Sequence, residues 1–260
     1  MRRTLTGTPY APSRLAQWVH SLLNWIAAER FPILPCAGPL AGYRMKIDWH
    51  RYRSFAYGTW EPEVVSCLSR NLRPGSVALD IGAHIGFYTL LLSKLAGSEG
   101  MVYSFEPLPE NYRLLSENVE LNHCGNVRLF RKAILSQSGV ISVTVPANEP
   151  VPGSVSLATD YGTPPIQVEG VTLDEFAAQT GQAIHLVKMD VEGAEHDVLV
   201  GGRATIQKHR PALLIELHHF DGGPDDHPVL ALLRGWNYGV EWLNRMPETS
   251  HIFCRPLEGD

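Results

Sequence analysis

The chain has 260 residues, of which 44% are hydrophobic, and carries a formal net charge of −5. This length and composition fit one globular α/β domain with an extension, and an acidic balance without a dense Lys/Arg run argues against nucleic-acid binding. The four cysteines lack Cys-x-x-Cys spacing, which is typical of reduced structural cysteines in a cytoplasmic protein and excludes a cysteine-based zinc site.

The first 57 residues are predicted to be an extension, with the main domain spanning 58–260. Apolar residues recur at helical spacing over 15–26, which predicts an amphipathic helix that packs on the domain or forms a homodimer contact. A proline-rich connector, 31–40, follows, and the runs 43–48 and 52–57 are expected to pair as a short hairpin. No run of 18 consecutive apolar residues is present, so we expect no membrane span.

The next pattern is an apolar run that ends in an acid and leads into a glycine-bearing loop. Residues 77–87 read Val-Ala-Leu-Asp-Ile-Gly-Ala-His-Ile-Gly-Phe, and a helical pattern follows directly. Asp80 ends the predicted strand, and Gly82 and Gly86 leave room for a ligand to approach backbone N–H groups. The Gly-x-x-x-Gly spacing differs from the dinucleotide fingerprint Gly-x-Gly-x-x-Gly, which favours a nucleoside ligand without phosphates. S-adenosylmethionine is the obvious candidate.

A second apolar run, 101–107, repeats the pattern of a strand that ends in an acid. Its acid, Glu106, lies 20 residues after Gly86. An acid at the end of the second strand, about 20 residues beyond the glycine loop, is where a carboxylate binds the two hydroxyls of a ribose. The repeated pattern favours a nucleoside site over a strand–helix turn without a ligand.

The rest of the chain alternates predicted strands with predicted helices. Helices are expected over 109–122, 172–180, 194–209 and 228–235. Strands are expected over 126–135, 140–145, 166–171, 184–190 and 211–218, with a closing hairpin from 240–243 and 252–255. Such alternation predicts an α/β fold with a mostly parallel sheet of about seven strands, helices on both faces and one antiparallel strand from the hairpin.

Several blocks of the chain together resemble the FkbM family of S-adenosylmethionine-dependent methyltransferases. The blocks are Val77–Phe87, Tyr103–Asn111, Asn126–Leu129, Lys132–Leu135, Val171–Asp174, Leu186–Glu195, Val198–Gly201 and His209–Glu216. They follow one another in the right order over about residues 58–218, which is more specific than any single motif.

This resemblance implies a class I methyltransferase fold, which is Rossmann-like, with S-adenosylmethionine as cofactor. It further implies methyl transfer to a hydroxyl of a sugar or another small natural product. By resemblance, Asp80, Gly82 and Gly86 belong to the cofactor loop and Glu106 holds the ribose. His84 stands where the family usually has Asn, which adds a titratable group to the loop and leaves its role open.

Asp190 ends the predicted fourth strand of the sheet. Methyl transfer to a hydroxyl requires that the hydroxyl lose its proton, and the acceptor must be held in a mostly water-free pocket. Asp190 is therefore the first choice for an acid that accepts this proton or binds the acceptor. Glu192, two residues further on, either faces the acceptor as well or stabilises the N-terminus of the next helix.

Glu216 and His218 end the predicted fifth strand and, by strand alternation, lie on the same face. His218 or His219 is a candidate general base, since an unperturbed imidazole titrates near neutral pH. Asp190, Glu216 and His218 also have the ligand types for Mg²⁺ or another divalent ion, which would lower the pKa of a bound hydroxyl. The sequence leaves the identity of the base and the need for a metal open.

Glu61 closes the element Gly58-Thr-Trp-Glu61, which resembles a Gly-x-x-Glu element of the same family. Two interpretations stay open for this residue. It contacts the cofactor or closes the pocket, or it stabilises the N-terminus of the helix that follows.

Three other functions were weighed against an O-methyltransferase with a small hydroxyl acceptor. Methylation of nitrogen, carbon or a macromolecule is disfavoured because no Asn-Pro-Pro-Tyr type motif follows the fourth strand and no basic stripe is present. A non-catalytic scaffold is disfavoured by the intact cofactor-loop acids and glycines. A nicotinamide oxidoreductase is disfavoured by the missing dinucleotide fingerprint.

Overall fold

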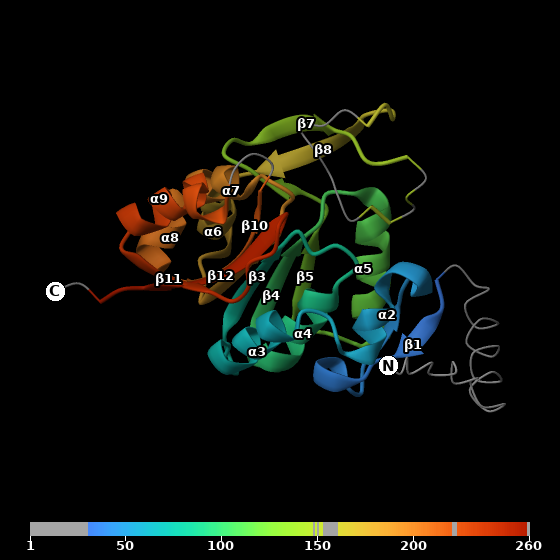
Figure 1. The fold of residues 1–260 in the computed structure, drawn as a ribbon. Coiled ribbons are helices and arrows are strands. Elements are labelled where there is room, and N and C mark those ends of the chain that lie inside the picture. Colours follow the sequence, from blue (N-terminus) through green and yellow to red (C-terminus); the bar gives the residue numbers. More distant parts are fainter. Residues whose placement is uncertain (1–30, 148, 150, 153–160, 220–222, 259–260) are drawn as a thin grey trace, which may run out of the picture.

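Within the residues that the structure describes, 31–147, 149, 151–152, 161–219 and 223–258, a seven-stranded sheet forms the centre of the molecule (Figure 1). This computed structural model has the strand order β11-β12-β10-β9-β3-β4-β5. The bounds are β3 Val77–Ile81, β4 Met101–Phe105, β5 Val127–Phe130, β9 Leu186–Met189, β10 Ala212–His218, β11 Tyr238–Trp242 and β12 Thr249–Pro256. Strand β12 is antiparallel to both neighbours and the other pairs are parallel, which confirms the predicted fold class.

Different sets of helices cover the two faces of the sheet (Figure 1). One set is α3 (Pro62–Asn71), α4 (Phe87–Ala96) and α5 (Pro109–Leu121), and the other is α6 (Leu173–Thr180), α7 (Glu195–Gly201), α8 (Arg203–His209) and α9 (Pro228–Gly235). Because side chains alternate along a strand, each face of the sheet has its own apolar core. Ala78 packs in the core beneath α3, α4 and α5, and Leu79 and Ile81 pack in the core beneath α6 to α9. Among the described residues, no helix has both the length and the apolar content to cross a membrane.

The segment before α3 folds differently from the prediction. The observed elements are β1 (Ile33–Pro35), the short 3-10 helix η1 (Gly38–Leu40), β2 (Arg44–Lys46) and α2 (Trp49–Tyr57). Strands β1 and β2 pair with each other, so the predicted hairpin of 43–48 with 52–57 is wrong in its second strand. Asp48 accepts a hydrogen bond from the His50 amide, and Gly58 ends α2 with a φ of 68°, so both caps favour a helix here.

Helix α2 packs against the main domain. Its residues Tyr52, Phe55 and Ala56 are buried in the same core as Phe87 of α4. The division of the chain at residue 57 stays a prediction. The amphipathic helix over 15–26, on which the homodimer prediction depends, lies outside the described residues.

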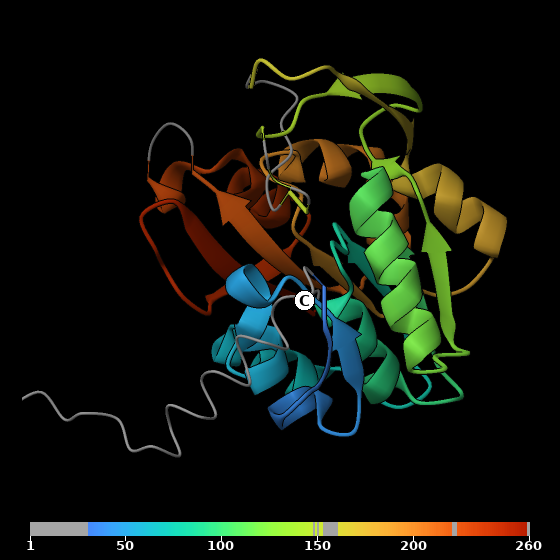
Figure 2. The same ribbon diagram turned by 90° about the vertical axis from the view of Figure 1, so that its right-hand side faces the viewer.

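A small second sheet stands beyond the carboxyl end of β5 (Figure 2). The predicted strand over 126–135 is divided into β5 and β6 (Ala133–Ile134), because the chain leaves the main sheet after Phe130. Strand β6 pairs with β8 (Ile166–Val171), which also pairs with β7 (Gly139–Val143). Val143, Val168 and Leu108 form a local apolar cluster, which seats this sheet over the main domain.

The predicted helix over 194–209 is two helices, α7 and α8, that meet at a glycine pair. A Cβ on Gly201 would lie 2.0 Å from the Leu135 carbonyl oxygen, and one on Gly202 would lie 2.6 Å from the Leu173 side chain. Neighbouring elements occupy the space that side chains at these two positions would need. The predicted helix is therefore divided at this glycine pair.

Candidate active site

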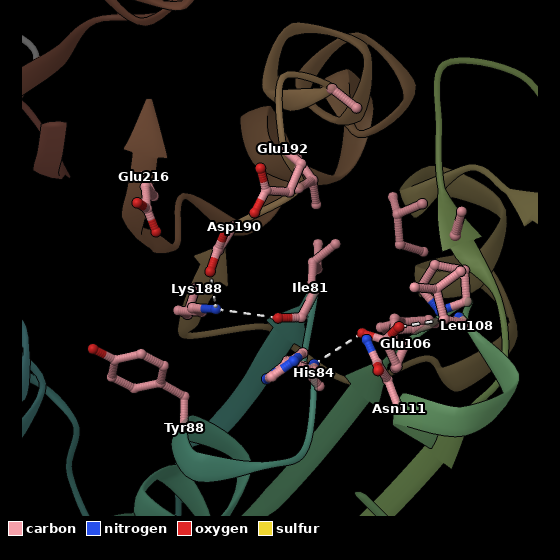
Figure 3. A pocket seen from close by; sticks show the side chains of 18 of the residues that line it. Ile81, His84, Tyr88, Glu106, Leu108, Asn111, Lys188, Asp190, Glu192 and Glu216 are labelled. Atoms are coloured by element: carbon pink, nitrogen blue, oxygen red, sulfur yellow. Dashed lines mark hydrogen bonds and ion pairs between the residues drawn. The ribbon is translucent and has the colours of Figure 1, made fainter. Parts of the chain in front are cut away.

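A cavity of about 940 Å³ opens at the carboxyl ends of β3, β4 and β9 (Figure 3). Its size lies near the upper end of ligand sites, which leaves room for a nucleoside cofactor and an acceptor. Most of the sequence-predicted site residues line it, namely Glu61, Gly82, His84, Glu106, Asp190 and Glu216. Asp80, Gly86 and His218 are not among the residues that line it.

Glu106 is fixed by the backbone at one end of the cavity. Its carboxylate accepts hydrogen bonds from the His84 amide at 2.9 Å and the Leu108 amide at 3.0 Å. Burial raises the pKa of Glu106 to about 7, against the lowering effect of these two hydrogen bonds. The carboxylate thus stands after β4, at the position predicted for a ribose-binding acid.

His84 shapes the same end of the cavity. It has a φ of 50°, and its Nε2 lies 3.3 Å from the Tyr52 hydroxyl of α2. Burial lowers the pKa of His84 to about 3, so the ring is neutral. The ring therefore offers hydrogen bonding without charge, and it links the loop to the segment before the main domain.

Asp80 lies beneath the glycine loop rather than in the cavity. It is fully buried, and its Oδ2 accepts a hydrogen bond from the Thr89 hydroxyl at 2.6 Å. Its Oδ1 lies 3.6 Å from the Lys188 ammonium. The structure thus gives Asp80 two partners from α4 and β9, and its contact with the cofactor stays a prediction.

The glycines of the loop allow neighbouring elements to pack closely, and their predicted role in cofactor binding stays a prediction. Gly82 has a φ of 79°, and a Cβ there would lie 1.7 Å from the Asp190 carbonyl oxygen. Its amide donates to the Phe105 carbonyl at 3.0 Å. A Cβ on Gly86 would lie 2.7 Å from a Leu115 methyl group. Both glycines therefore allow close packing between elements, and the Gly82 amide already has a partner in the protein.

Lys188 was missed by sequence reasoning and lies at the centre of the site. It is 5% exposed, and its Nζ lies 3.3 Å from the Gly82 carbonyl oxygen and 3.5 Å from Asp190 Oδ2. The ammonium also stands 4.9 Å from the centre of the Tyr88 ring. A signal was present, because buried parallel strands are usually apolar runs and β9 reads Leu-Val-Lys-Met.

Asp190 points into the cavity between Lys188 and Glu192 (Figure 3). Burial raises the pKa of Asp190 to about 6, although the Lys188 charge lowers it. The carboxylate is therefore mostly ionised near neutral pH and still basic enough to take up a proton.

His218 is held as a cation behind the cavity wall. Its Nδ1 donates to the fully buried Glu195 at 2.7 Å, and its Nε2 lies 3.4 Å from Glu192 and 4.0 Å from Asp190. Burial lowers the pKa of His218, but the Glu195 hydrogen bond and the nearby carboxylates outweigh it and raise the pKa to about 9. A protonated imidazole cannot accept a proton, which argues against His218 as the general base. His219 instead bonds the Ser250 hydroxyl at 2.9 Å.

Glu192 lines the cavity and does not cap the next helix. Helix α7 begins at Glu195, and within the described residues no side chain caps it. Glu195 accepts a hydrogen bond from the Gly193 amide, which shapes the turn below Glu192. Burial raises the pKa of Glu192 to about 7. The interpretation of Glu192 as a helix cap is therefore not what the fold shows, and its carboxylate faces the site.

Glu61 and Glu216 meet at His251 of β12. The His251 Nε2 lies 3.5 Å from Glu61 and 3.4 Å from Glu216, and Glu61 accepts a hydrogen bond from the Tyr88 hydroxyl. Glu61 precedes α3 but makes no capping hydrogen bond with any described residue, so it lines the pocket instead. Burial raises the pKa of Glu216, but its pairing with His251 outweighs this effect and lowers it.

The predicted metal-ligand set of Asp190, Glu216 and His218 does not come together. Among the described residues, ligand atoms gather in two groups, Asp190 with Glu192 and His218, and Glu216 with Glu61 and His251. Each group contains a histidine whose pKa is raised by its carboxylates despite burial. A metal-bound histidine must be neutral, so these groups fit ion pairs better than a divalent cation.

Comparison with known proteins identifies the family. The model of the methyltransferase FkbM domain matches residues 80–240. The 2-O-methyltransferase NoeI of Sinorhizobium fredii is 30% identical over 184 residues, which are 62% of this chain and 73% of that protein. The 31-O-demethyl-FK506 methyltransferase FkbM of Streptomyces tacrolimicus is 28% identical over 199 residues, which are 65% of this chain and 75% of that protein.

A solved structure supports the fold. A candidate rRNA methylase from Clostridium thermocellum superposes with a TM-score of 0.50 at 12% identity, over 76% of this chain and 96% of that one. At this identity the likeness concerns the fold alone. The family match, the relatives and the cavity at the strand ends agree, and the chain belongs to the FkbM family of S-adenosylmethionine-dependent methyltransferases.

Proposed function

We propose that this enzyme methylates a hydroxyl oxygen of a small acceptor, either a sugar or another natural product. The observation that carries the proposal is one cavity with two kinds of carboxylate. Glu106, bound by backbone amides, suits a ribose diol, and Asp190, beside Lys188, suits an acceptor hydroxyl. The names of two relatives, both O-methyltransferases, support oxygen as the methylated atom.

Cofactor binding is assigned to the Glu106 end of the cavity. Glu106 accepts hydrogen bonds from the ribose hydroxyls, and the apolar side chains of Leu108, Ile134 and Val168 beside it provide a surface for the base. Bound S-adenosylmethionine supplies a methyl group on a positively charged sulfur. The neutral His84 ring adds no positive charge to this end of the cavity.

Proton removal is assigned to Asp190. It lines the cavity, and with a pKa of about 6 it is ionised near neutral pH, as a general base must be. Glu216 is a weaker base, because its pairing with His251 lowers its pKa despite burial. Glu192, with a pKa of about 7, is the second candidate for this role.

The proposed reaction includes no divalent metal ion. The carboxylates that would bind one are already compensated by Lys188, His218 and His251. In the proposed reaction the acceptor hydroxyl loses its proton to Asp190. The Lys188 ammonium beside Asp190 stabilises the negative charge that develops on the acceptor oxygen.

Calorimetric titration of the purified protein with S-adenosylmethionine and S-adenosylhomocysteine tests the proposal, followed by a screen of hydroxyl and amine acceptors. We expect binding of both nucleosides in the wild type and in Asp190→Asn, with turnover on hydroxyl acceptors lost in that variant. Methylation of amines but not of hydroxyls, or no binding of either nucleoside by the folded wild type, would contradict the proposal.

A further inference from the structure

We propose that Lys188 is a positioning residue for the proton acceptor, an inference that rests on the proposed role of Asp190. Its ammonium holds the Asp190 carboxylate in an ionised state at the cavity wall and ties it to the cofactor loop. The contacts are the Asp190 Oδ2 at 3.5 Å and the Gly82 carbonyl oxygen at 3.3 Å. One buried cation thus joins the group that takes the proton to the loop that faces the cofactor.

Strand register explains how the lysine reaches both carboxylates. Lys188 of β9 stands directly opposite Asp80 of β3, and in a parallel pair such neighbours share a face of the sheet. Asp80 Oδ1 accepts no hydrogen bond from any described residue and lies 3.6 Å from the Lys188 Nζ. Lys188 therefore compensates a fully buried carboxylate on one side and a cavity-lining one on the other.

A purely structural role does not account for this arrangement. Two apolar residues in place of a buried ion pair are often as stabilising, because burial of charges is costly. The strand around Lys188 is otherwise apolar and buried, so an Asp80–Lys188 pair is not required for a stable sheet. What distinguishes the pair is the third partner, Asp190, at the cavity.

The charges around Asp190 show why a cation is needed there. Anionic side chains face it from several elements, and they favour its protonated form. They are Glu61 before α3, Glu106 after β4, Glu192 before α7 and Glu216 of β10. Lys188 and the protonated His218 oppose them, His251 of β12 interacts with Asp190 in the same sense, and Tyr88 faces the site as a neutral phenol. Removal of the Lys188 charge therefore raises the pKa of Asp190.

The test separates the two partners of Lys188. A Lys188→Met change alone leaves Asp80 as an uncompensated buried charge and destabilises the fold. We therefore compare Asp80→Asn with the double variant Asp80→Asn/Lys188→Met, in which the buried pair is neutral. Relative to Asp80→Asn, the double variant loses the one charged contact of Lys188 with Asp190, together with its uncharged contacts to the Gly82 carbonyl oxygen and the Tyr88 ring. Lys132→Met is the matched control, because Lys132 also lines the cavity but pairs with Glu169 on the small sheet.

The readout is the pH titration of the Asp190 carboxyl group. It is monitored by carbon-13 NMR on protein labelled at the aspartate carboxyl carbons, and the Asp190 signal is assigned from its absence in Asp190→Asn. We expect the midpoint of the double variant to lie about one pH unit or more above that of Asp80→Asn, and that of Lys132→Met to match the wild type. Equal midpoints in Asp80→Asn and the double variant would overturn the proposal and leave Lys188 as a partner of Asp80 alone.

Activity gives an independent second readout. We expect methyl transfer by the double variant at neutral pH to fall about tenfold or more below that of Asp80→Asn, with the gap closing as the pH rises. A gap of the same size at every pH would contradict the proposal. Because the NMR titration needs neither cofactor nor acceptor, failure of the proposed reaction and failure of this inference are distinguishable.

Discussion

The two ends of the cavity hold their carboxylates in different ways (Figure 3). At one end, Glu106 accepts hydrogen bonds from backbone amides at 2.9 and 3.0 Å. At the other end, Asp190 and Glu216 depend on the side-chain cations Lys188 and His251, at 3.5 and 3.4 Å. Backbone amides do not titrate near neutral pH, and only proline removes them, whereas side-chain cations can be lost by titration or by many substitutions. The donors at the first end are therefore set by local chain geometry, and those at the second depend on the charges of distant residues.

The largest expected effect is at the end held by cations. Asp190→Asn removes the proton acceptor, and we expect turnover to fall about 100-fold or more while the affinity for S-adenosylmethionine changes less than about threefold. Steady-state kinetics and calorimetry measure the two quantities. Glu192→Gln, two residues away and also in the cavity wall, is the matched control. If Glu192→Gln lost turnover and Asp190→Asn kept it, the proton acceptor would be Glu192.

The second effect concerns stability at the same end. Burial lowers the pKa of His218, but Glu195 and its neighbours outweigh it and raise the pKa to about 9. Because the folded pKa lies above the usual value, this pairing stabilises the fold at and below about pH 6.5 and its contribution is lost as the pH rises towards 9. The full difference corresponds to ~3 kcal/mol.

Urea unfolding across this pH range checks that effect in the wild type and in Glu195→Gln/His218→Gln. The double variant removes both charges of the Glu195–His218 pair, so the fully buried Glu195 is not left as an unpaired ion. We expect the free energy of unfolding of the wild type to fall with pH relative to that of the variant. Parallel curves would show that His218 is not held as a cation.

A smaller effect is expected at the end held by the backbone. Glu106→Gln weakens two charge-assisted hydrogen bonds and the contact with the ribose, and we expect the affinity for S-adenosylmethionine to fall about 10- to 100-fold. S-adenosylhomocysteine should lose the same factor, because the ribose is common to both. Glu110→Gln on the exposed face of α5, where Glu110 pairs with Arg113, is the control. A loss confined to one nucleoside would contradict the assignment.

The smallest effect is expected on removal of divalent ions. Since each carboxylate group is already paired with a histidine, His218 or His251, dialysis against EDTA or addition of MgCl₂ should change turnover less than about twofold. A strong requirement for Mg²⁺ in the wild type would contradict this expectation and show that a metal ion replaces the protons of these histidines.

Local patterns were sufficient for the Glu106 end. The sequence correctly places the strand, acid and glycine loop of residues 77–87 and the second strand before Glu106. It also correctly predicts the α/β sheet with its closing hairpin. These features depend on neighbours in the chain and on a regular period of apolar residues. The same patterns failed at 52–57 and 126–135, where helix caps and a departure from the sheet outweighed the apolar run.

By itself the sequence determined the class of fold, most of the order of its strands and helices, and the acids at or just after the carboxyl ends of β3, β4 and β9, because each of these is encoded within a few neighbouring residues. Only the tertiary structure decided which partners those acids have. Lys188 of β9 lies opposite Asp80 on the neighbouring strand β3. His251 of β12 contacts Glu61 and Glu216 from a strand near the end of the chain. Such contacts join residues far apart in the chain, and burial then sets their charges, so no local pattern contains them.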